Sequence, residues 1–248
     1  MKMLKYSGER RSMPMREQAL LLWYHLRLLN WWLFLLMVLG FFVAGLLVWF
    51  QVQRGSAEFM YNAGVLSRFM LEPGIGLFAG LLASVLIVGD PLLSVVMATS
   101  RGLYSVVLWR LLLSCSGLLL CSMVFLGWTL ALGVDYARQQ GPLWFLLGWL
   151  APFCLMSMLG LLGSLLTRNA TLGLLLAVLP LVASLFLYEK LSSIEALHPF
   201  FITYTFSGGQ DAPDWWINRL TLLALAAGCA LCNWWLLRRE ERLLNEKQ

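Results

Sequence analysis

Charged residues are scarce in this chain: Asp, Glu, Lys and Arg make up only 12% of its 248 residues, against about 25% in a typical soluble domain. Six segments of 17 residues or more contain none, namely 28–53, 73–89, 111–134, 139–167, 169–188 and 220–237. A helix of about 20 apolar residues crosses the hydrocarbon layer of a bilayer, where the backbone must satisfy its own hydrogen bonds. The sequence therefore excludes an ordinary water-soluble fold. It predicts an all-α polytopic membrane protein with six transmembrane helices.

Histidine and lysine are also scarce, which argues against histidine-based catalytic or metal sites and against a phosphate-binding loop. The two histidines, His25 and His198, are far apart in the sequence, and no H-E-x-x-H pattern occurs. The four lysines stand at 2, 5, 190 and 247, and none belongs to a phosphate-binding loop. We therefore expect no catalytic residue, metal or cofactor in this chain, and any ATP and Mg²⁺ chemistry would belong to a partner.

Ionisable residues are predicted only at the ends of the spans. Glu72, Asp90, Arg110 and Arg168 each border a charge-free segment. Ion-coupled transporters place such residues inside the bundle, so ion-driven transport is disfavoured. The five cysteines all lie within predicted spans and are interpreted as small apolar filler.

The distribution of basic residues predicts the orientation. With a cytoplasmic N-terminus, thirteen Lys and Arg residues fall on the cytoplasmic side and five on the outer side. The positive-inside rule selects this arrangement, with both termini cytoplasmic. The net charge of +5 is explained by topology and requires no nucleic-acid partner.

We expect one membrane domain over residues 1–248. A cytoplasmic tail and a short interfacial helix would occupy 1–30, the six-span bundle 31–237, and a helical cytoplasmic tail 238–248. The alternative for the lead-in segment, 14–28, is a cytoplasmic extension of the first span.

Three connecting segments are informative. Residues 52–72 are predicted as an outer loop, with Pro73 at the start of the second span. Residues 92–110, after Asp90-Pro91, predict a helix on the cytoplasmic membrane surface, or else an ordinary turn. The mixed segment 189–218 predicts short amphipathic or re-entrant pieces on the outer side.

Small residues predict where helices pack closely. Gly76-x-x-x-Gly80 and Ala79-x-x-x-Ala83 mark one face of the second span. Ala224-x-x-x-Gly228 and Ala226-x-x-x-Ala230 mark a face of the sixth. Both faces are candidate dimer or sliding surfaces.

Two stretches resemble the membrane (permease) subunit of a type-2 ABC transporter of the exporter kind. Residues 76–110, GLFAGLLASVLIVGDPLLSVVMATSRGLYSVVLWR, are similar to that family's second span, coupling helix and third-span start. Leu197-His198-Pro199-Phe200, then WWINR at 215–219 and RREERLL at 238–244, resemble its last outer loop and sixth span.

The resemblance implies one of two permease subunits, identical or paralogous, in a bacterial plasma membrane, bound to two copies of an ABC ATPase. The ATPases would grip the coupling helix, and the interfacial helix would follow the movement. The implied coupling residues are Asp90, Ser94, Met97, Thr99, Ser100, Arg101 and Tyr104, and the implied interfacial-helix residues are Arg16, Glu17 and Arg27.

The expected function is therefore export of a hydrophobic or amphipathic substrate (a lipid, peptide or drug-like molecule), driven by a separate ATPase. One alternative is a membrane-complex or regulatory subunit that does not transport. Another is an intramembrane lipid-modifying enzyme, which would need polar residues gathered at one depth, and the sequence predicts no such cluster.

Overall fold

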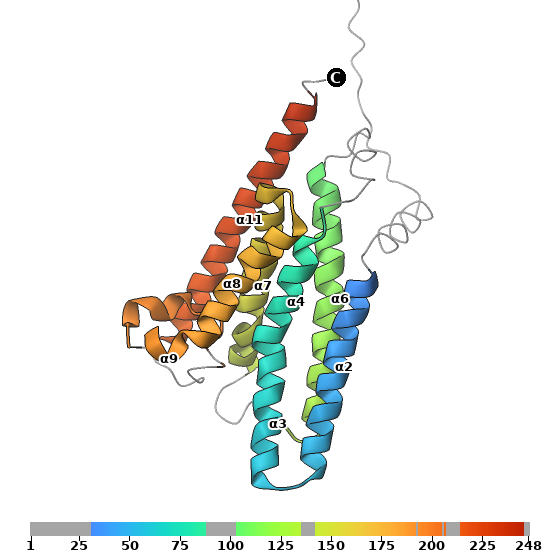
Figure 1. The fold of residues 1–248 in the computed structure, drawn as a ribbon, viewed down its shortest axis with the longest axis vertical. Coiled ribbons are helices and arrows are strands. Elements are labelled where there is room, and N and C mark those ends of the chain that lie inside the picture. The colour runs from blue at the N-terminus through green and yellow to red at the C-terminus, as the bar shows by residue number, and fades with distance from the viewer. Residues whose placement is uncertain are drawn as a thin grey trace, which may run out of the picture.

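A computed structural model describes residues 31–87, 103–134, 142–191, 193–204, 206 and 214–245, and the regular elements within them are all helical (Figure 1). The elements are α2 (Trp31–Gln53), α3 (Ala57–Phe69), the π-helix η1 (Met70–Gly74), α4 (Ile75–Ser84), α6 (Leu103–Ala131), α7 (Pro142–Thr167), α8 (Ala170–Phe186), α9 (Tyr188–Leu191), the 3₁₀-helix η2 (Glu195–Phe200) and α11 (Trp215–Asn245).

Five helices are long and apolar enough to cross a membrane, so the predicted helical membrane protein is confirmed at this level. They are Trp32–Gln53, Ala57–Ser84, Tyr104–Ala131, Leu146–Thr167 and Trp215–Arg239. Helix α8 is apolar but has only 17 residues, or roughly 26 Å at 1.5 Å per residue. Its role as a sixth span stays a prediction.

The predicted outer loop at 52–72 is wrong. The chain turns at Arg54–Ser56, and Ser56 caps the next helix by accepting a hydrogen bond from the Phe59 N–H at 3.4 Å. From Ala57 the chain is helical through to Ser84, so Pro73 lies inside the helix rather than at its start. The π-turn η1 accommodates Pro73, because an irregular turn tolerates a residue without an N–H donor.

The third long helix also starts earlier than predicted. Residues 103–110, which the sequence assigned to the surface helix while also counting 107–110 as the start of the third span, belong to α6. Arg110 did not end the apolar helix, because its side chain is buried and donates to the Leu86 carbonyl at 3.4 Å. The remainder of the predicted surface helix, and the whole interfacial helix at 14–28, lie outside the described residues.

Helix α7 is central to the bundle. It packs against α4, α8 and α11. In its most apolar stretch 61% of the helix is buried inside the protein, whereas the corresponding share for α11 is 22%. A single residue separates the charge-free segments 139–167 and 169–188, which predicts a tight turn there, and the structure confirms it. Arg168 is left-handed (φ 53°), and Asn169 caps α8 through its Oδ1. Figure 1 shows α4 in the middle of the view, with α2 and α6 to one side and α8 and α11 to the other.

The predicted close-packing face of the second span is confirmed, but it packs within the chain. A Cβ on Gly160 would lie 2.3 Å from the Gly80 carbonyl oxygen, and one on Gly80 would lie 2.9 Å from the Ala177 Cβ. Because α7 and α8 cover this face, it is not a dimer surface. On α11, Ala226 is buried while Ala224 and Gly228 are exposed.

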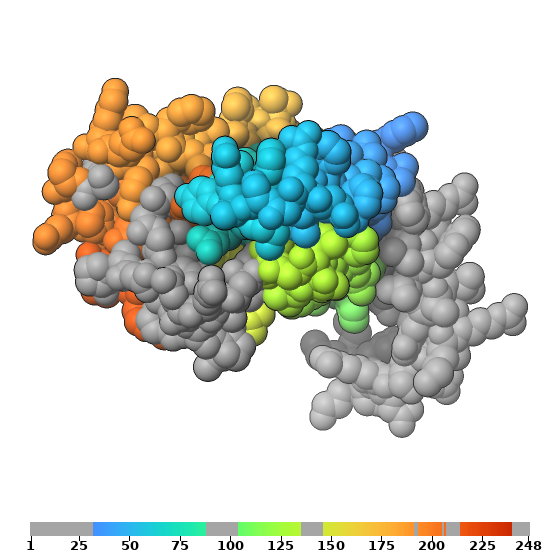
Figure 2. Space-filling view, turned by 90° about the horizontal axis from the view of Figure 1, so that it is seen from below, coloured from blue at the N-terminus to red at the C-terminus, as the bar shows by residue number. Residues whose placement is uncertain are grey.

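The segment between α8 and α11 folds back onto the bundle as a cap. We use "outer cap" for residues 194–204, which include η2 and the turn that ends at Tyr204; the word "outer" refers only to the side that the sequence predicts for this segment. Ile202 packs with α7, α8 and α11, while Phe201 and Tyr204 pack with Trp215. In Figure 2 the orange residues of α8 and the cap gather on one side and the α2–α3 turn on the other.

Candidate functional site

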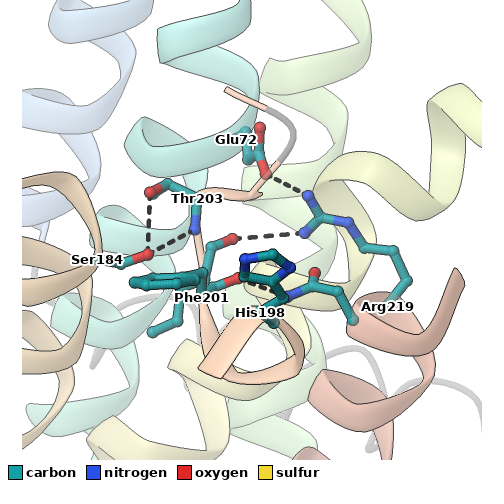
Figure 3. Close-up of polar contacts among 8 residues, drawn as sticks. Glu72, Ser184, His198, Phe201, Thr203 and Arg219 are labelled. Atoms are coloured by element: carbon teal, nitrogen blue, oxygen red, sulfur yellow. Dashed lines mark hydrogen bonds and ion pairs between the residues drawn. The ribbon is translucent and has the colours of Figure 1, made fainter. Parts of the chain in front are cut away.

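A buried ion pair lies where the second long helix, α11 and the outer cap meet. Arg219 Nη2 donates to the carboxylate Oε1 of Glu72 (Figure 3). The Arg219 side chain is fully buried and Glu72 is 5% exposed. Two charges at such depth are stable only when they are paired and further hydrogen-bonded.

The local sequence explains how both charges reach this point. Glu72 lies near the middle of the helix Ala57–Ser84, within η1, where the helical ladder is already irregular. Arg219 is one turn into α11, and its guanidinium lies 5.7 Å from the centre of the Trp215 ring. The indole provides an electron-rich face that suits a desolvated cation.

The outer cap completes this arrangement with backbone carbonyls. Arg219 Nη1 donates to the Ile202 carbonyl at 3.4 Å. Asn218 Nδ2 donates to two further carbonyls, those of His198 at 2.7 Å and Phe201 at 2.9 Å. The start of α11 therefore binds the cap through two adjacent side chains.

A second polar pair joins the cap to α8. Ser184 Oγ accepts a hydrogen bond from the Thr203 N–H at 3.0 Å and lies 3.0 Å from the Thr203 hydroxyl. Both residues are buried. Together with Glu72, Asn218 and Arg219, they form what we call the polar cluster.

At the rim of the cap, His198 bridges to the beginning of α11. Its Nδ1 lies 3.1 Å from Asp214 Oδ2 and 3.5 Å from the Tyr204 hydroxyl. Burial raises the pKa of the Tyr204 phenol, and nearby Tyr188 and Asp214 raise it further. The hydroxyl therefore keeps its proton at neutral pH and is available as a donor.

We call this set of contacts the interlock, because it joins separate segments of the chain. Within the described part of the chain, Ser184 bonds with Thr203 and His198 with Asp214. The Glu72–Arg219 pair ties two long helices and the cap together. These contacts fix the relative positions of three segments that are distant in sequence.

Sequence reasoning missed this cluster. It placed Glu72 at the end of a span and predicted no polar cluster. In the structure Glu72 lies inside the helix Ala57–Ser84 and is bonded to Arg219. One signal was available: Glu72 is the only Asp or Glu from 59 to 89, and Arg219 is the only Lys or Arg from 191 to 237. Isolated ionisable residues within apolar helices favour pairing with one another.

The predicted coupling residues are almost all beyond what the structure describes. Tyr104 is described, and it lies in the first turn of α6, packed against a cluster that includes Val107 and Leu237. The other predicted site residues lie outside the described ranges: Arg16, Glu17, Arg27, Asp90, Ser94, Met97, Thr99, Ser100 and Arg101.

Removing the Asn218 amide is expected to loosen the outer cap. Asn218→Ala removes the side-chain donor to the Phe201 and His198 carbonyls, which costs about 1–3 kcal/mol in free energy of unfolding. Hydrogen exchange should rise at the amides of 201–204. Thr221→Ala is the matched control, because Thr221 bonds only back to Ile217 of its own helix. Equal effects from the two variants would contradict the role assigned to Asn218.

No protein family, curated protein or solved structure matches this chain.

Proposed function

We propose that this chain is the permease subunit of an ATP-driven ABC exporter, which moves a hydrophobic or amphipathic substrate while a separate ATPase hydrolyses ATP. The subunit would act as a pair in a bacterial plasma membrane, with both termini cytoplasmic and α8 as the sixth span. ATP-driven closure of the ATPases would push on the segment before α6 and tilt the long helices.

The observation that carries the proposal is the order of the elements. In the part of the chain that the structure describes, most residues belong to long apolar helices. The one extended segment there that does not span is the outer cap, between α8 and α11. The resembling family is expected to carry its outer insertion between the fifth and sixth spans. The sequence contains no phosphate-binding loop, so energy from ATP must come from a partner.

The contacts between the helices also suit a transporter on which an ATPase acts from one side of the membrane. Central helices α4 and α7 meet backbone to backbone at Gly80 and Gly160. The Glu72–Arg219 pair connects the same long helix to α11 at the cap. A push at the inner ends would therefore be transmitted along rigid helices rather than lost in local bending.

The polar cluster favours a second candidate, an intramembrane lipid-modifying enzyme. Such an enzyme needs polar residues at one depth, and Glu72, Ser184, Asn218 and Arg219 meet that requirement. Their bonds to one another and to the cap favour an interlock, which is why the permease is the first proposal. If Glu72→Gln abolishes a lipid-modifying activity of the purified chain alone, the enzyme is favoured.

Charge reversal at Arg101 is expected to release the ATPase. The tagged chain is expressed in its native host, and any ABC ATPase that co-purifies with it is quantified. Arg101→Glu should weaken retention at least tenfold, a loss of about 1.4 kcal/mol. The matched control is Arg54→Glu, at the exposed turn between α2 and α3, the opposite end from the start of α6 (Figure 1).

Two results would overturn the permease proposal. One is a purified chain that carries out its activity with no ATPase present. The other is labelling of residues 90–110 from the extracytoplasmic side of intact cells, since the coupling segment must face the ATPase. Equal retention in Arg101→Glu and Arg54→Glu would reject the assigned coupling residue.

A further inference from the structure

An apolar groove runs between α2 and α6, at the opposite side of the central helices from the polar cluster. It encloses ≈ 410 Å³. Its lining consists of Val38, Phe41, Phe42, Gly45, Leu46, Leu120, Cys121, Val124, Phe125 and Trp128. The volume falls within the range of small-molecule sites, about 300–1,000 Å³.

The groove exists because a glycine faces a tryptophan. Trp128 Nε1 donates to the Gly45 carbonyl at 3.3 Å, and a Cβ on Gly45 would lie 3.4 Å from the Trp128 ring. Deeper in, the rings of Phe41 and Phe125 meet with centroids 5.5 Å apart. The two helices therefore touch through aromatic rings and leave a hollow beside them.

The lining offers no charge, and its side-chain donors are the weak thiol of Cys121 and the indole N–H of Trp128. The indole N–H is already engaged by the Gly45 carbonyl. A headgroup or a peptide backbone would lose its hydrogen bonds to water on entering, and this costs free energy. Apolar cavities of this kind exclude water and accept hydrocarbon. The occupant that matches this lining is a hydrocarbon chain.

The position of the groove agrees with this chemistry. The lining spans 38–46 of α2 and 120–128 of α6, within helices apolar enough to lie in the hydrocarbon layer. Nine residues rise about 12 Å. At the rim, Phe42, Leu120 and Val124 are 60–67% exposed, so the groove opens outward where lipid would stand.

A second copy of the chain fits less well. Ten residues line the groove, whereas a stable protein interface takes about 20–30 residues a side. A concave hollow also suits a narrow chain better than the broad surface of a helix. We propose that the groove between α2 and α6 binds one acyl chain of a membrane lipid. This proposal does not depend on the permease assignment.

Photolabelling with a lipid that carries a diazirine in mid-chain tests the proposal. The full chain is placed in vesicles of phosphatidylethanolamine and phosphatidylglycerol that contain labelled phosphatidylglycerol, and adducts are mapped by peptide. Adducts should concentrate on 38–46 and 120–128. Equally exposed apolar faces, such as those at Leu179 of α8 and Leu231 of α11, report ordinary lipid contact.

Filling the groove should remove the excess labelling. Gly45→Leu places a side chain in the hollow, and labelling of the groove peptides should fall at least tenfold, to the level of the α8 and α11 faces; a tenfold change corresponds to about 1.4 kcal/mol. Gly127→Leu is the matched control, because Gly127 is exposed on α6 with nothing within 4 Å of its Cβ position. It should label like the wild type.

A second variant, in the α6 wall of the groove, leaves the contact between Gly45 and Trp128 intact. Leu120 is exposed, and Leu120→Trp should narrow the groove and lower the labelling of the groove peptides as Gly45→Leu does. Three results would overturn the proposal: even labelling of all lipid-facing helices, unchanged labelling in both groove-filling variants, or a photocrosslinker at Phe42 that captures a second copy of the chain instead of lipid.

Discussion

Replacing Arg219 by methionine is expected to lower the free energy of unfolding by about 3–5 kcal/mol, because it leaves the buried carboxylate of Glu72 without its cation. The Ile202 carbonyl loses a donor in the same variant. Reversible titration with a denaturing detergent in mixed micelles measures this change. Such a loss is a large fraction of the stability of a typical protein.

Two further variants separate the loss of the pair from the loss of a charge. Arg68→Met removes an exposed arginine from α3, the helix that leads into η1, and should change stability by less than about 0.5 kcal/mol. The double variant Glu72→Met with Arg219→Met should recover much of the loss, because no unpaired charge remains buried. Equal losses in Arg219→Met and Arg68→Met would show that the pair contributes nothing.

Adding one methyl group to Gly160 is expected to destabilise the bundle by about 1–3 kcal/mol, at the upper end of that range. The new Cβ would lie 2.3 Å from the Gly80 oxygen and 3.0 Å from its carbonyl carbon. Backbone atoms cannot change rotamer, so α4 and α7 must separate. The same detergent titration measures the loss.

The same substitution elsewhere on α7 is the control. Gly148 has no described heavy atom within 4 Å of its Cβ position. Gly148→Ala should therefore be neutral or stabilise slightly, since alanine favours helix by about 0.5–1 kcal/mol over glycine. If Gly160→Ala is as stable as Gly148→Ala, the close approach of α4 and α7 is not tight in the protein.

Local sequence patterns predicted the elements that depend on neighbours in the chain. The charge-free segments located the apolar helices, and the short interval between 139–167 and 169–188 located the turn at Arg168-Asn169. The G-x-x-x-G face at Gly76 and Gly80 was predicted as a close-packing surface. Its partner was not, because the same small residues suit an interface within one chain or between two.

The misplaced boundaries share one cause. Pro73 and Arg110 were interpreted as the ends of apolar helices, because a proline breaks the ladder and a bare charge is costly in lipid. In the folded chain a π-turn accommodates the proline, and the Leu86 carbonyl accepts from the arginine. Neither the π-turn nor the hydrogen bond to the Leu86 carbonyl can be predicted from the few residues on either side of Pro73 or Arg110.

The sequence by itself determined that this chain is helical and belongs in a membrane, because the cost of burying charge and unsatisfied backbone in lipid acts on every segment separately. Only the tertiary structure decided that Glu72 and Arg219, 147 positions apart, share one buried site with the outer cap. It also decided that α2 and α6 leave a groove between them. Pairing of distant charges and imperfect helix packing depend on how whole helices meet, and no single segment carries that information.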